Sequence, residues 1–187
     1  MIFSITNIKP QVTSKRNCIA IAVLLVLITV LPSIKVKAQA TITAQVFAEV
    51  IPALTATEVS QLNFGRFSPE TQGGSVLVTP DGSRTSTGTV ALSGGTHNPA
   101  SFYITGEGGA TFSIILPSGP AILSSTSNSK TMMVSNWNST PSQGVGTGLL
   151  APGSQEVKVG ATLIVGSMDQ NPVGIYTGTY AITFGYN

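Results

Sequence analysis

Near its end this chain alternates apolar residues with small and polar ones at every second position. Residues 174–187 read GIYTGTYAITFGYN, and one parity carries Gly174, Tyr176, Gly178, Tyr180, Ile182, Phe184 and Tyr186. A period of two places these residues on one face of a β-strand. Because an apolar strand left unpaired invites association, we expect the rest of the domain, a chaperone or a neighbouring subunit to cover it.

The same alternation recurs along the chain. One early segment has an apolar face made of Ile42, Ala44, Val46, Ala48 and Val50. Shorter strands are predicted around 76–78, 90–92, 100–104, 112–116, 131–134 and 157–165, with turns between them such as Pro80-Asp81-Gly82, where Gly82 takes a positive φ. No window after residue 38 has a helical period. This spacing predicts an all-β sandwich of about eight or nine strands, with polar loops at 124–129 and 138–148.

The first 38 residues have the features of a cleaved signal peptide. Basic residues precede an apolar run from Cys18 to Leu31, and small residues follow at two places, which predicts cleavage after Ala38 or Ala40. The run is shorter than the ~20 residues of a membrane-spanning helix. We therefore predict an exported protein with no membrane span after cleavage and a single domain over 39–187, in which 39–51 is either a first strand or a donor strand.

Charge and cysteine content narrow the function further. Five of the nine basic residues lie in the predicted signal peptide, and the rest of the chain has four basic against seven acidic residues, a net charge of −3. Such a surface is a poor partner for nucleic acid. The only cysteine, Cys18, is also in the signal region, so the exported domain is expected to fold by burial alone, without disulfides.

No catalytic motif stands out, and we predict a non-enzymatic protein without a cofactor or a metal. His97 is the only histidine and lies in a predicted turn, where a solvated side chain is the ordinary role. The acidic residues are scattered singly rather than clustered as metal ligands. Trp137, between Asn136 and Asn138, is the one candidate for stacking on a sugar ring, although a large residue beneath a loop is the commoner role.

Two smaller features predict local structure. Asn63-Phe64-Gly65 is typical of a strand that ends at a tight corner, with Phe64 turned inward. Arg84 has two acidic residues as candidate partners, Asp81 and Glu70, and an exposed pair of this kind contributes little to stability.

The two ends of the exported chain resemble those of chaperone–usher pilus subunits, which carry a glycine fourteenth from the end and an aromatic residue second from the end. Gly174 and Tyr186 occupy these places. The resemblance implies an incomplete immunoglobulin-like sandwich that accepts a donor strand from the next subunit. Ile42, Ala44, Val46, Ala48 and Val50 would be the donor residues. The chain departs from many such subunits by lacking their disulfide.

A second resemblance covers nearly the whole exported chain. It rests on a series of short motifs in order, which are LNFG at 62–65, VTPDGSR at 78–84, FYITG at 102–106, MVSNW at 133–137 and PVGIYTGTY at 172–180. This pattern is similar to a secreted bacterial family known as domain of unknown function 4402. Pilus proteins of the spore-coat-U type end in a similar strand. The resemblance implies an exported β-domain of a bacterium with an outer membrane.

Together these features predict an exported structural or adhesive protein, a pilus-like subunit that assembles by strand complementation at the cell surface after passing through the periplasm. Its expected partners are copies of itself or related subunits, and a periplasmic chaperone. Two alternatives stay open. One is a self-complete monomeric surface or matrix domain, and the other is a carbohydrate-binding module that uses Trp137.

Overall fold

The computed structural model describes residues 19–20, 22–26 and 38–187, and the chain divides into two units, Met1–Phe47 and Ala48–Asn187. In the first unit, 19–20 and 22–26 are helical, and 38–47 are in neither a helix nor a strand. Within these described segments, no helix is both long and apolar enough to cross a membrane. Most of the predicted signal peptide, including Cys18, lies outside the described residues.

The second unit consists of antiparallel strands, which confirms the predicted all-β fold. The strands are β1 (Thr55–Ser60), β2 (Phe67–Val78), β3 (Arg84–Leu92), β4 (Ala100–Thr105), β5 (Thr111–Ile115), β6 (Ala121–Ser125), β7 (Thr131–Thr140), β8 (Gly144–Leu149), β9 (Ser154–Val165), β10 (Tyr176–Thr177) and β11 (Thr183–Tyr186). They form one sheet of eight strands and one of three.

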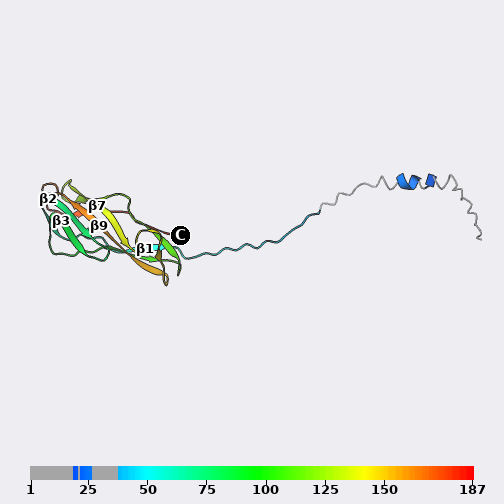
Figure 1. The fold of residues 1–187 in the computed structure, drawn as a ribbon, viewed down its shortest axis with the longest axis horizontal. Helices are drawn as coiled ribbons and strands as arrows, with labels where there is room; N and C mark the ends of the chain where they lie inside the picture. The colour runs from blue at the N-terminus through cyan, green and yellow to red at the C-terminus, as the bar shows by residue number, and fades with distance from the viewer. Residues whose placement is uncertain (1–18, 21, 27–37) are drawn as a thin grey trace, which may run out of the picture. The chain divides into compact units, whose positions relative to one another are not determined.

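The long strand β9 is the centre of the larger sheet, as Figure 1 shows with β2 and β7 beside it and β3 beyond β2. On one side β9 pairs with β7 along most of its length. On the other side its first half pairs with β4 and its second half with β2. β1 adds to β4, β3 adds to β2, and β6 with β10 completes the side next to β7.

The last strand changes sheets, contrary to the single strand predicted over 174–187. β10 pairs with β6 in the larger sheet, whereas β11 pairs with β5 in the smaller one. The residues between them leave the ladder, although Gly178 passes so close to β6 that a Cβ there would lie 2.3 Å from the Ile122 carbonyl oxygen. The predicted face is nevertheless the inner one, since Tyr176, Tyr180, Ile182 and Phe184 are each more buried than the odd-numbered neighbour before them.

The interior consists of two apolar clusters. The first cluster contains Phe64, Val76, Val78, Val90, Met132, Val134, Ala161, Leu163 and Val165. The second cluster contains Ala100, Ile104, Phe112, Ile114, Leu116, Leu150, Val157 and Val159. β9 contributes to both, and Trp137 and Leu62 pack against both.

Three strands, β1, β6 and β8, were not predicted from the sequence, the segment 42–50 forms no strand, and the last predicted strand is divided into β10 and β11. The described residues thus have eleven strands rather than about eight or nine. The loop predicted over 138–148 was largely wrong, because β7 runs to Thr140 and β8 begins at Gly144. β8 has too few apolar side chains to show a two-residue period, and one of its glycines, Gly148, is needed for packing. A Cβ on Gly148 would lie 2.3 Å from the ring of Phe112, at the middle of the second cluster.

Candidate functional site

The stretch Ser60–Pro69 runs from the last residue of β1 into the start of β2 and forms one side of an open groove, here called the first wall. Asn63 bridges to Asn98 through paired main-chain hydrogen bonds of 2.9 and 3.0 Å. The Asn63 side chain accepts a 2.8 Å hydrogen bond from the Gly65 amide, and Gly65 adopts a φ of 72° that favours glycine. This corner turns Phe64 inward, as predicted, where it is only 8% exposed.

Arg84 fastens the first wall to β3. Its guanidinium donates to three main-chain carbonyl oxygens, those of Phe64 at 3.1 Å, Arg66 at 3.4 Å and Ser93 at 2.7 Å. The sequence-based expectation that Arg84 pairs with Asp81 or Glu70 is therefore replaced by a carbonyl-binding role. Asp81 instead accepts hydrogen bonds from Thr79 and Ser83, which lower the pKa of its carboxyl group.

The opposite side of the groove, the second wall, is formed by Asn171–Tyr180. Asn171 is buried and fixes the start of this wall: its amide nitrogen donates to the Thr131 carbonyl at 2.8 Å, and its oxygen accepts from the Gly166 amide at 2.6 Å. β10 pairs with β6 and is the last strand on that side of the larger sheet. Its other edge therefore has no strand beside it among the described residues.

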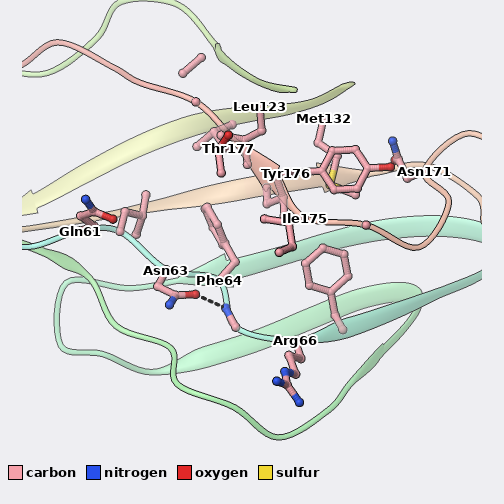
Figure 2. A pocket seen from close by; sticks show the side chains of 18 of the residues that line it. Gln61, Asn63, Phe64, Arg66, Leu123, Met132, Asn171, Ile175, Tyr176 and Thr177 are labelled. Atoms are coloured by element: carbon pink, nitrogen blue, oxygen red, sulfur yellow. Dashed lines mark hydrogen bonds between the residues drawn. The ribbon is translucent and has the colours of Figure 1, made fainter. Parts of the chain in front are cut away.

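Between the two walls lies a groove of about 1000 Å³. Its floor is part of the first cluster and includes Met132, Val134 and Leu163. Figure 2 shows Phe64 extending from the first wall into the groove, with Ile175, Tyr176 and Thr177 on the other side. At the rim, Val173 and Ile175 are 93% and 69% exposed. An apolar floor and an apolar rim beside an unpaired strand edge are features of a surface that binds an extended chain.

Trp137 and Tyr180 lie together where the groove meets the second cluster. Their rings stack with centroids 4.6 Å apart at an interplanar angle of 30°, and the indole nitrogen donates to the Gly119 carbonyl at 3.1 Å. One face of the indole and its only donor are thus already used within the fold. Burial, followed by the negative charge of Glu58, raises the pKa of Tyr180 to about 12.

The structure separates the predicted assembly residues into three groups. Gly174, Tyr176 and Tyr180 line the groove. Ile182, Phe184 and Tyr186 pack against the second cluster instead. The predicted donor residues Ile42, Ala44, Val46, Ala48 and Val50 are exposed and belong to no strand.

The remaining candidates from the sequence show no shared site. His97 is exposed in the connection between β3 and β4. In the described part of the chain, no three His, Cys, Asp or Glu side chains gather closely enough to hold a metal ion.

The first wall, Arg84 and Asn171 were missed as site residues. Arg84 and Asn171 are polar residues in loop-like sequence, and nothing in their immediate neighbours distinguishes them from solvated side chains. The motifs LNFG and PVGIYTGTY, noted above for the family resemblance, do contain parts of the two walls.

Comparison with known proteins gives one result. No curated protein and no solved structure was found to match the chain. A family model described as "Domain of unknown function (DUF4402)" matches residues 54–186, which include both walls of the groove and every strand. The chain therefore belongs to the DUF4402 family.

Proposed function

We propose that this protein is an exported, non-enzymatic structural or adhesive subunit that assembles at the cell surface by strand complementation. The groove of one copy takes residues 41–51 of a second copy as an added strand. The observation that supports this best is the groove itself, which has an apolar floor and lies beside the unpaired edge of β10, in a chain that also carries an exposed segment of alternating apolar residues.

The side-chain pattern of the segment suits the second wall. Large and small residues alternate in the segment, as Ile42, Ala44, Val46, Ala48 and Val50. The even-numbered positions of the wall also alternate, as Gly174, Tyr176, Gly178 and Tyr180. Gly178 lacks a side chain because the chain passes against β6 there, where a Cβ would lie 2.3 Å from the Ile122 carbonyl oxygen. Tyr176 and Tyr180 are therefore the large side chains of this wall that an added strand would contact.

The point where the segment joins the domain favours binding of the segment in the groove of a second copy rather than in its own groove. The Tyr186 hydroxyl donates to the Pro52 carbonyl at 2.9 Å, so the segment is attached beside the end of the last strand. Figure 1 shows the C-terminus close to β1, where the domain begins. The groove starts at Tyr180, six residues back along the chain, which is about 20 Å for an extended chain at ~3.3 Å per residue. If the segment folded back into the groove of its own domain, about half of its length would be needed to cover this distance, and only the other half could lie in the groove.

Binding of the segment is favourable only if side-chain burial and main-chain hydrogen bonds both contribute to the free energy. Burying Ile42, Val46 and Val50 gives about 1.5–3 kcal/mol each. Fixing the backbone of a segment this long costs about 1–2 kcal/mol per residue. Apolar burial alone is therefore insufficient, and main-chain hydrogen bonds to the free edge of β10, at a net ~0.5–1.5 kcal/mol each, have to contribute.

The test uses polymer formation by the protein expressed from its complete sequence and purified from the bacterial surface or the growth medium. We expect wild-type protein to elute from size-exclusion chromatography as a series of oligomer peaks. Deletion of 39–51 should abolish these oligomers, and so should the single change Val46→Asp, because an unpaired carboxylate against the apolar floor of the groove costs several kcal/mol.

The matched control is the same valine-to-aspartate substitution at Val145, an exposed residue on β8 that lies away from the groove. This variant should form the same oligomers as the wild-type protein. Wild-type protein that stays a stable monomer at every concentration would refute the proposal and favour a self-complete surface domain. Loss of binding to glycans in Trp137→Ala, with polymers unaffected, would instead favour a carbohydrate-binding module.

A further inference from the structure

Two tyrosines of the second wall differ in how their hydroxyl groups are satisfied. Tyr176 is in β10 and Tyr180 lies three residues after the end of β10, and both line the groove. The Tyr176 hydroxyl donates to the Pro172 carbonyl at 2.9 Å. The Tyr180 hydroxyl is buried and is the one buried side-chain polar atom of the described residues that has no hydrogen-bond partner.

The position of the Tyr180 hydroxyl is fixed by its surroundings. The ring stacks on Trp137, and Trp137 is in turn held by the Gly119 carbonyl. Tyr180 also packs against the second cluster, so it lies where the groove ends and the closed interior begins. The raised pKa, about 12, keeps this hydroxyl protonated at neutral pH, so it stays a hydrogen-bond donor.

Buried hydroxyl groups in native proteins nearly always have a partner, and an unpaired one destabilises the fold that contains it. Building on the proposed function, we infer that the Tyr180 hydroxyl is a binding contact for the incoming strand, to which it donates a hydrogen bond at a main-chain carbonyl and so adds affinity. The acceptor has to be main chain, since Ile42, Ala44, Val46, Ala48 and Val50 carry no polar side-chain atom.

The experiment compares Tyr180→Phe with Tyr176→Phe, each in the protein expressed from its complete sequence. The first measurement is the binding of a fluorescent synthetic peptide with the sequence of residues 39–52, followed by anisotropy at protein concentrations where oligomers are absent. The second is the free energy of unfolding without the peptide, from urea denaturation.

We expect the two variants to respond in opposite ways. Tyr180→Phe should bind the peptide about three- to tenfold more weakly, the effect of one neutral hydrogen bond, while its stability without the peptide is equal to or above that of wild type. Tyr176→Phe should bind the peptide within about twofold of wild type and be less stable, because it loses a hydrogen bond that exists in the free chain.

Three outcomes would overturn the inference. If wild-type protein binds the peptide and Tyr180→Phe binds it equally well, the inference fails while the proposed function stands. If Tyr180→Phe is less stable and its binding is unchanged, the hydroxyl holds a buried water molecule rather than a strand. If wild-type protein neither binds the peptide nor forms polymers, the proposed function fails and the inference fails with it.

Discussion

At the scale of single residues, Tyr186 joins three parts of the chain through one hydroxyl group. The hydroxyl oxygen accepts a 2.7 Å hydrogen bond from the Glu107 amide and donates to the Pro52 carbonyl at 2.9 Å. Gly106 makes room for it, because a Cβ at that position would lie 2.1 Å from the tyrosine oxygen. The aromatic residue second from the end is thus a structural clamp on the start of the domain, whatever else binds it.

Tyr186→Phe should lower the free energy of unfolding by about 1–3 kcal/mol, the cost of leaving a partly buried amide without its partner. Urea denaturation measures the change. Tyr103→Phe is the control: the Tyr103 hydroxyl also bonds, to Ser154 at 2.9 Å, but it is exposed and water can replace it. Equal stability losses in the two variants would contradict the clamp.

At the scale of elements, the first wall is held in place from outside its own sequence. Arg84, eighteen or more residues away from it, binds the carbonyl groups of Phe64 and Arg66. The corner also needs Gly65, where a Cβ would lie 2.2 Å from the Arg84 guanidinium. Phe64 therefore reaches the first cluster because Gly65 leaves room for the Arg84 guanidinium and Arg84 in turn holds the corner in place.

Arg84→Lys should destabilise the domain by about 1–3 kcal/mol and loosen the first wall, because one ammonium group cannot replace a planar fork that reaches three carbonyl groups. Hydrogen exchange at residues 63–66 and urea denaturation report the two effects. Arg66→Lys, at an exposed side chain in the same wall, should change neither. A normal exchange rate in Arg84→Lys would show that the wall holds its shape without the fork.

At the scale of the whole molecule, β9 couples the two apolar clusters. Ala161, Leu163 and Val165 belong to the first cluster, and Val157 and Val159 belong to the second. A strand shared in this way makes independent unfolding of either half unfavourable, so the domain should unfold in a single cooperative transition.

Leu163→Ala in the first cluster and Leu150→Ala in the second should each cost about 2–5 kcal/mol, the usual penalty for a cavity in a packed core. Both should shift one transition that circular dichroism and tryptophan fluorescence report at the same urea concentration. Separate transitions by the two probes in either variant would show that the clusters are independent.

The sequence predicted those features that depend on neighbouring residues. The all-β class, the β4 and β9 strands, the inward Phe64 and the turn at Asp81-Gly82, where Gly82 has a φ of 88°, all follow from local periodicity and turn chemistry. Features that depend on distant partners were missed. β8 has no clear period because three of its six residues are glycines, one of which, Gly148, accommodates Phe112. Arg84 was given acidic partners because carbonyl groups cannot be recognised in a sequence.

By itself, the sequence determined that this chain forms β-strands with one apolar face and that a second alternating segment, 42–50, precedes them. A two-residue period fixes which side chains share a face, and that is a property of the chain alone. Only the tertiary structure decided that the last strand divides between two sheets and that a groove opens between its first half and the Ser60–Pro69 wall. Which strand edges are left without a neighbour depends on contacts between residues far apart along the chain, and no local pattern specifies them.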